Sequence, residues 1–273
     1  IEYWMPYEFT CSWSGVAISC ANVIGTSPNL GGSRPAGSCW SMTRATSTGT
    51  LSEKRDTRIH EIGHNMGVSH ATGYEAEYGD PTDVMGVGEV NTFSAAVRWQ
   101  MGWLAHTQPT IADGATSVYN IRELAVDPST ASDGYHSIVA IRCPECLAPG
   151  SEGDDSSSST ATQVIGGTII VSYRGAAAYT LEQPHRSAVH VHLAKRRYGN
   201  GQWTGGTSVY GILRPGASEH IEFNGLAITV CSVSATHATV AFHSSPGGTS
   251  RTAAIAAATA ACPSSSTTSP PPP

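Results

Sequence analysis

Residues 60–70 read His60-Glu61-Ile62-Gly63-His64-Asn65-Met66-Gly67-Val68-Ser69-His70. On an α-helix, His60 and His64 share one face and lie one turn apart. Two neutral imidazoles at that spacing can bind one metal ion. Gly67 lets the chain leave the helix sharply, so that His70 returns as a third ligand. Three protein ligands leave one coordination position open for water or substrate, which is typical of a catalytic zinc site.

Glu61 follows the first of these histidines and is not needed as a ligand. A carboxylate at this place can hold the water that zinc has acidified and accept its proton. The alternative is a helix that carries three incidental histidines and a glutamate. Five specified residues within eleven, each with a chemical role, favour the zinc site.

This stretch resembles the long signature H-E-x-x-H-x-x-G-x-x-H of the metzincin metallopeptidases at all five fixed positions. Metzincins also carry a methionine turn below the metal. A candidate for that turn is Asp80-Pro81-Thr82-Asp83-Val84-Met85-Gly86. The resemblance implies that Met85 forms a soft, apolar floor under the histidines, with Gly67 as the second structural support of the site.

Further segments resemble the gametolysin family, the metzincins of green algae that act on hydroxyproline-rich extracellular matrix. They are Cys11-Ser12-Trp13-Ser14-Gly15, the zinc motif up to Ala71, the candidate methionine turn, and Phe93 to Leu104. The resemblance covers residues 7–104 well and the rest loosely. Some members have Gln at the first motif position, so His60 brings this chain closer to the matrix-metalloprotease members. The resemblance implies a secreted zinc endopeptidase of an extracellular matrix or cell wall, with protein or glycoprotein substrates.

A second hypothesis is a structural matrix or cell-wall protein that uses a peptidase-like domain as a scaffold. A scaffold has no need of Glu61, so its presence beside all three ligands favours the enzyme. The residue that stabilises the oxyanion is left open. Some metzincins use a Tyr two residues past the methionine, where this chain has Val87, and Tyr74 or Tyr78 are the substitutes considered.

The composition narrows the classes of partner. The chain has 273 residues, of which 40% are hydrophobic and only 13% charged, with a formal net charge of -6. This charge gives no electrostatic reason to expect nucleic acid or an anionic membrane as a partner. No apolar run approaches the ~20 residues of a transmembrane helix.

The seven cysteines favour disulfides in an oxidising, extracellular compartment over a second zinc cluster. They are Cys11, Cys20, Cys39, Cys143, Cys146, Cys231 and Cys262. The Cys143/Cys146 pair has a redox alternative, but no thioredoxin-like βαβ pattern surrounds it. Val16-Ala17-Ile18, between Cys11 and Cys20, suggests a disulfide-pinned hairpin.

The predicted fold class is α+β: a metzincin-like catalytic domain over 1–104, an antiparallel β-sandwich over 105–246 and a Ser/Pro-rich low-complexity tail over 247–273. Two helices are expected, one starting near Arg58 with Asp56 or Thr57 as its cap, and one over 94–104 capped by Ser94. The strand candidates of the sandwich are 137–141, 168–173, 188–193, 227–233 and 238–242. Residues 149–162 are expected to form a solvated acidic insertion, with calcium binding as the alternative. His190 and His192 share a strand face and are interpreted as a surface or packed pair.

The catalytic domain is also expected to be incomplete at its N-terminal side. Residues 25–38 read as loop, and no stretch within 1–57 has a helical period long enough for the first helix of a metzincin. The sheet that pairs with extended substrate would need this segment. A missing N-terminal segment of the same precursor is therefore an expected partner, and the odd cysteine count points the same way.

Overall fold

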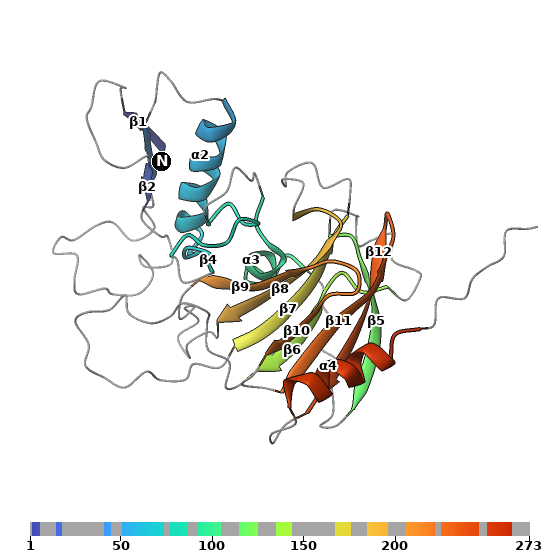
Figure 1. Ribbon diagram of the computed structural model, residues 1–273. Coiled ribbons are helices and arrows are strands. Elements are labelled where there is room, and N and C mark those ends of the chain that lie inside the picture. The colour runs from blue at the N-terminus through green and yellow to red at the C-terminus, as the bar shows by residue number, and fades with distance from the viewer. Residues whose placement is uncertain are drawn as a thin grey trace, which may run out of the picture.

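The structure is a computed structural model. It describes residues 2–5, 15–17, 41–44, 51–73, 77–86, 92–104, 115–124, 135–143, 167–175, 185–195, 206–221, 225–245 and 250–263. Among these residues it has both helices and sheets, so the fold class is mixed α and β (Figure 1). None of the described helices is long and apolar enough to cross a membrane.

A three-stranded sheet lies beside the first described helix. Its order is β1 (Glu2–Met5), β3 (Ser41–Arg44), β2 (Gly15–Ala17), with β1 parallel and β2 antiparallel to β3. Helix α2 (Leu51–Asn65) packs against β2 and β3. The described partner of β2 is the more distant β3, and most of the hairpin expected between Cys11 and Cys20 lies outside the described residues. The expected helix start near Arg58 is wrong: the helix begins at Leu51, and Asp56 and Thr57 lie inside it.

Two larger sheets build the rest of the described chain. The five-stranded sheet has the order β4 (Thr72–Gly73), β9 (Thr207–Leu213), β8 (Ala188–Lys195), β7 (Gly167–Arg174), β6 (Val139–Cys143). The four-stranded sheet has the order β10 (Ser218–Ile221), β11 (Leu226–Val233), β12 (His237–Ser244), β5 (Thr116–Arg122). All neighbours in both sheets are antiparallel except β4 and β9, which are parallel.

One apolar core lies between these two sheets. It takes Ile169, Val171 and Tyr173 from β7, and Ile228 and Phe242 from the four-stranded sheet, among others. Alternate residues of a strand point to opposite faces, and the next residue along β7, Ile170, belongs to a second cluster with Ala95 and Ala96 of helix α3 (Ala95–Gln100). The five-stranded sheet is thus covered on both faces, which explains why β7 reads as a nearly continuous apolar run.

All five strand candidates of the sequence are confirmed as β6, β7, β8, β11 and β12. The helix expected at 94–104 is confirmed but shorter. Ser94 is its cap and accepts a hydrogen bond from the Val97 amide, the helix ends at Gln100, and Gly102 has φ +73°. The strands β5, β9 and β10 were not expected, because their alternation is interrupted by polar and glycine residues.

The low-complexity assignment of 247–273 did not anticipate a third helix. Helix α4 (Arg251–Ala260) is capped by Ser250 and packs Ala254 and Ala258 on Ala227 of the four-stranded sheet (Figure 1). A disulfide between Cys231 and Cys262 closes this arrangement. It confirms one of the expected disulfides; the expectations for Cys11, Cys20, Cys39 and Cys146 lie outside the described residues, as does the acidic insertion.

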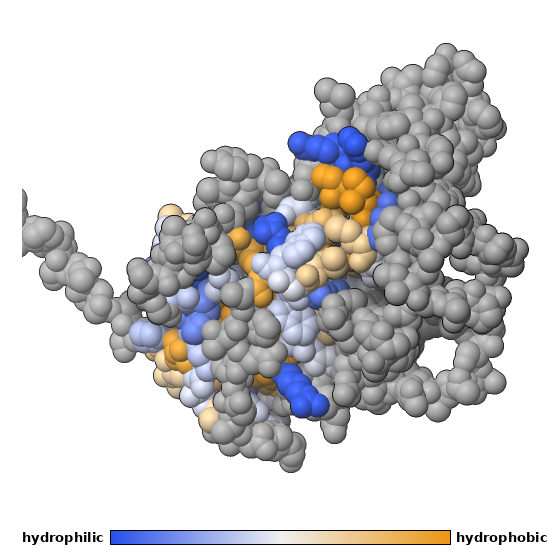
Figure 2. All heavy atoms as spheres, turned by 180° about the vertical axis from the view of Figure 1, so that it is seen from behind, coloured by the Kyte–Doolittle hydropathy of each residue, from blue (hydrophilic) through white to orange (hydrophobic). Residues whose placement is uncertain are grey.

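Large apolar side chains also remain at the described surface. They are Ile62, Tyr78, Trp103 and Val118. Figure 2 shows hydrophobic and hydrophilic residues interspersed over the described part of the face that it draws. Two of these four residues, Ile62 and Tyr78, belong to the region around the histidine motif.

Candidate metal centre

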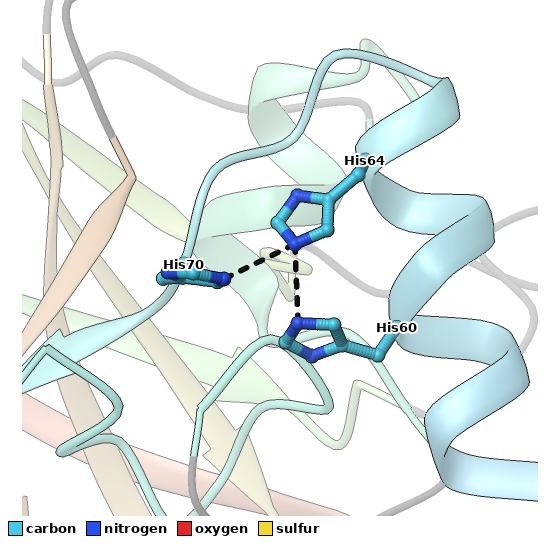
Figure 3. A group of neighbouring side chains, drawn as sticks. All are labelled: His60, His64 and His70. Atoms are coloured by element: carbon cyan, nitrogen blue, oxygen red, sulfur yellow. Dashed lines mark hydrogen bonds between the residues drawn. The ribbon is translucent and has the colours of Figure 1, made fainter. Parts of the chain in front are cut away.

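Helix α2 and the turn after it bring His60, His64 and His70 together. His60 and His64 project from the same face of α2, and Gly67, with φ +87°, turns the chain so that His70 faces them (Figure 3). The Nε2 atom of His64 lies 3.1 Å from Nε2 of His60 and 3.1 Å from Nε2 of His70. The sequence motif therefore predicted this cluster, which is the only group of three potential metal-binding side chains among the described residues.

The other ring nitrogen of each histidine contacts an oxygen. Nδ1 of His60 lies 2.8 Å from the carbonyl of Val84, and Nδ1 of His64 lies 2.8 Å from the carbonyl of Val68. Nδ1 of His70 lies 2.6 Å from a carboxylate oxygen of Glu77. A carbonyl or carboxylate oxygen only accepts, so each Nδ1 carries the proton and each neutral ring presents the Nε2 lone pair.

Three converging lone pairs repel one another unless a cation lies between them. Tetrahedral zinc ligands at about 2.0–2.1 Å from the ion are separated from each other by roughly 3.3 Å. The 3.1 Å separations of the Nε2 atoms are close to this value. The donor set, its geometry and its fixed tautomers thus fit a divalent metal of the zinc type.

Burial favours the neutral form of the His60 and His64 rings. Desolvation lowers the pKa of His60 to about 4, although the hydrogen bond that His60 donates to the Val84 carbonyl raises it, and the neighbouring histidines lower it further. Desolvation also lowers the pKa of His64, with a smaller contribution from His70. Neutral imidazole is the form that binds a metal, so the site is prepared for one at neutral pH.

Glu61 lies on the same helix and is only 5% exposed. Its burial raises the pKa of the carboxyl group to about 7. Among the described residues, its buried Oε2 atom has no hydrogen-bond partner. A buried carboxylate oxygen without a hydrogen-bond partner is costly, so its presence suggests a use beyond folding.

Met85 lies beneath the helix, where the sequence placed the methionine turn. Its side chain is fully buried, and a Cβ atom on Gly63 would lie 2.5 Å from the Met85 sulfur. Gly63 stands between the two helical histidines, so the missing side chain lets Met85 approach the helix closely. A buried carboxylate shapes the turn: Asp83 accepts hydrogen bonds from the Met85 amide at 2.8 Å and from the Ser94 amide at 2.7 Å.

Tyr78 lies over two of the histidines. Its ring centroid is 4.1 Å from that of His70 and 6.0 Å from that of His60, and 36% of the residue is exposed. Desolvation raises the pKa of Tyr78, and the carboxylates of Glu77 and Glu61 raise it further. Of the two tyrosines considered from the sequence, Tyr78 is thus beside the cluster, while Tyr74 lies outside the described residues, as does Val87.

Four residues that contribute to the site were not identified from the sequence. Glu77 holds His70, Asp83 shapes the methionine turn, and Asp80 and His192 form a buried pair behind it. The two aspartates lie five and two residues before Met85 in the sequence, which was an available signal. His192 is 110 or more residues away from its partners and offered none. Of the two interpretations of His190 and His192, a surface pair or a packed pair, the structure shows the packed pair, because both side chains are buried.

Comparison with known proteins gives one match. The sequence model of the gametolysin peptidase M11 family matches residues 1–192, which include the histidine cluster and extend into β8. No curated protein and no solved structure gives a significant match.

Proposed function

The chain belongs to the gametolysin peptidase M11 family, and from this premise we propose that it is a secreted zinc-dependent endopeptidase that cleaves hydroxyproline-rich glycoproteins of an extracellular matrix or cell wall. The family makes the chain a metallopeptidase. The ion, the reaction and the substrate are the parts proposed here.

The observation that carries the proposal is the convergence of three Nε2 lone pairs, each fixed by an acceptor at Nδ1. We assign His60, His64 and His70 as the ligands of Zn²⁺. Three nitrogen ligands from the protein leave a position for the reacting groups, as in catalytic zinc sites. Gly67 and Met85 support this geometry through the turn after α2 and the floor beneath it.

We assign Glu61 as the general base. Zinc, when bound, polarises the scissile carbonyl and makes a water molecule acidic. Glu61 accepts the proton of that water and passes it to the leaving amine. The burial of Glu61 favours this proton transfer, because a poorly solvated carboxylate is a better base. The nearby cation would favour the charged form of Glu61. We assign Tyr78, whose ring lies beside His70 and His60, as the residue that would donate a hydrogen bond from its hydroxyl to the oxyanion.

The proposed domain arrangement follows from the same residues. The α2 region is a metzincin-like catalytic unit, and the two sheets that share one core form a β-sandwich behind it. The Cys231–Cys262 disulfide supports an oxidising, extracellular compartment. The substrate class rests on the gametolysin family and on the Ser/Pro-rich residues 263–273, a texture typical of wall glycoproteins.

The scaffold hypothesis explains the site less well. A structural protein gains nothing from a buried glutamate whose Oε2 atom has no hydrogen-bond partner among the described residues. A structural protein would also tolerate the loss of the acceptors that fix the tautomers of the three histidines. Both features are required by hydrolysis, so we favour the enzyme.

The first test combines metal analysis with one isosteric substitution. The protein should bind one Zn²⁺, and Glu61→Gln should retain it while the turnover of a matrix glycoprotein falls by about 10³-fold or more. The matched control is Glu123→Gln, at a buried glutamate outside the cluster, which should lower stability and leave turnover of the folded protein within about twofold. A Glu61→Gln protein that cleaves at the wild-type rate would remove Glu61 from the mechanism. A metal-loaded wild-type protein without peptidase activity would favour the scaffold.

A further inference from the structure

His192, on β8 of the five-stranded sheet, contacts the loop 80–86 behind the histidine cluster. It lies on β8 with a fully buried side chain, and its Nε2 atom is 3.0 Å from Oδ2 of Asp80. The same Nε2 atom is 3.2 Å from the hydroxyl of Thr82. Asp80 Oδ1 also accepts hydrogen bonds from the amide and the hydroxyl of Thr82, at 2.8 and 2.7 Å. His192 therefore donates to a carboxylate that organises the start of the loop.

The loop 80–86 contacts His60 directly and contacts His70 through the next residue, Ala71. The carbonyl of Val84 accepts the hydrogen bond that orients His60. The Ala71 amide, directly after His70, donates to the carbonyl of Met85 at 2.9 Å, and the Asp80 amide donates to the carbonyl of Ala71. A displacement of Asp80 would therefore reach His60 through Val84 and His70 through Ala71.

The same sheet also touches the site at a second place. A Cβ atom on Gly206, just before β9, would lie 1.6 Å from the His70 carbonyl oxygen, so strand and ligand backbone are in close contact. The next residues pair β4 with β9, and the Thr72 hydroxyl is 2.5 Å from that of Ser208. The five-stranded sheet is thus packed directly against the segment that carries the third ligand.

The buried surroundings of the His192–Asp80 pair give the loss of this interaction a high free-energy cost. Burial would raise the pKa of Asp80, but the charge of His192 and the hydrogen bonds from His192 and Thr82 hold it below its usual range. A second buried carboxylate, Asp83, and the guanidinium groups of Arg98 and Arg174 lie nearby, since their charges act on one another's pKa values. In such a poorly solvated cluster, a carboxylate that loses its partner has no water to replace it.

We propose that His192 is a positioning residue of the metal centre, which holds the loop 80–86 through Asp80 and so fixes the orientation of His60 and His70. This inference rests on the proposed function, because it concerns the metal that the function requires. It makes the five-stranded sheet part of the catalytic unit, although none of its side chains belongs to the histidine cluster. The predicted division of the chain at residue 104 would then not separate two independent parts.

The test measures the metal affinity itself. Zn²⁺ affinity is obtained by competition with a chromophoric chelator, and the ligand geometry is followed by the visible spectrum of the Co²⁺-substituted protein. His192→Phe keeps the ring volume and removes the donor. It should weaken Zn²⁺ binding about 10-fold or more and shift the Co²⁺ spectrum, as expected for a residue outside the ligand set. His192→Gln keeps a donor near the Nε2 position and should remain within about threefold of wild type.

The matched control is His190→Phe. His190 lies two residues earlier on the same strand and is equally buried, but its Nε2 donates to the carbonyl of His185 instead of the loop. His190→Phe should lower stability and leave the Zn²⁺ affinity and the Co²⁺ spectrum of the folded protein unchanged. Equal effects of the two phenylalanine variants, or a wild-type affinity and spectrum in His192→Phe, would overturn the proposal.

A milder variant decides the matter if His192→Phe does not fold. Thr82→Val removes the hydroxyl that joins His192 and Asp80 and should weaken Zn²⁺ binding about threefold, in the same direction. A wild-type affinity and spectrum in Thr82→Val would then overturn the proposal. Peptidase assays separate this outcome from a failure of the proposed function, because a wild-type protein that binds Zn²⁺ but cleaves nothing still allows the affinities to be compared.

Discussion

Between the two larger sheets the buried side chains are almost all aliphatic or aromatic, whereas behind the histidine cluster many are polar or charged. The first region is represented by Ile169, Leu193 and Phe242. In the second, a small apolar cluster around Met85 lies next to buried Asp80 and Asp83. Apolar packing tolerates small displacements, but hydrogen bonds between buried charged groups lose much of their energy when angles and distances change. The core therefore supplies stability, and the polar region supplies the geometry of the site.

Strand β8 belongs to both regions. Val189, Val191 and Leu193 point into the core between the sheets, and His190 and His192 occupy the alternate positions. One strand thus connects the apolar core on one face to the polar groups of the site on the other. This comparison predicts that the two regions can be disturbed separately, and three substitutions test it.

The largest effect is expected at His64, the histidine whose Nε2 lies 3.1 Å from both others. His64→Ala should weaken Zn²⁺ affinity by at least about 10⁴-fold, which corresponds to about 5.5 kcal/mol, and should abolish peptidase activity. The core between the sheets should remain intact. Isothermal titration with Zn²⁺ and thermal unfolding in the presence of a chelator measure the two effects.

The control for His64→Ala is His243→Ala, at a histidine of β12 that contacts Thr116 outside the cluster. It should bind Zn²⁺ like the wild type. If, in the presence of chelator, His64→Ala unfolds at a much lower temperature than the wild type, a change in the histidine cluster also destabilises the core, and the comparison is contradicted.

The converse substitution is Phe242→Ala, which removes a fully buried ring from the core and its edge contact with Tyr119. The cavity should lower the free energy of unfolding by about 3–5 kcal/mol. The Zn²⁺ affinity of the folded protein should stay within about threefold, because no contact described at the site involves this ring. Denaturant unfolding and chelator competition check both statements, and Phe242→Leu should give a smaller loss. A large loss of Zn²⁺ affinity in folded Phe242→Ala would contradict the comparison.

The smallest effect concerns His190, at the boundary of the two regions. Burial, with the nearby charges of His192 and Arg174, lowers its pKa from 6.5 to about 3. The unfolded chain therefore binds a proton below pH 6.5 that the folded protein does not bind until about pH 3. The stability that neutral His190 contributes is complete above pH 6.5 and is lost as the pH falls through this window.

The measurement compares urea unfolding of the wild type and His190→Gln at pH 7.5 and 5.0. Glutamine does not titrate, so the wild type should lose about 2 kcal/mol more than the variant between these pH values. Parallel pH profiles of the two proteins would show that His190 is already charged or exposed in the folded state.

The sequence alone was sufficient for the metal cluster and for the main strands. His60, His64 and His70 lie within eleven residues, and helix geometry together with one glycine turn brings them together without help from the rest of the chain. Short β-rich runs between turns likewise predicted β6, β7, β8, β11 and β12, because strand-forming residues lie next to one another in the sequence. The segment 80–86, which carries the buried Met85 against Gly63, was singled out for the same reason, since its signal is a short local motif.

The tertiary structure decided the features that depend on residues far apart in the chain. Thr72 and Gly73 pair with Ser208 and Val209, and Asp80 meets His192, across more than 100 residues each. No periodicity encodes which distant polar group a buried carboxylate will contact, because this depends on how the sheets pack. Helix α4 was missed because residues 247–273 were assigned as one low-complexity tail, although its alanines have a high helix propensity. Only the tertiary structure shows where it packs, on Ala227 and beside the Cys231–Cys262 disulfide. Local spacing thus determined the histidine cluster, and long-range packing determined what holds it in place.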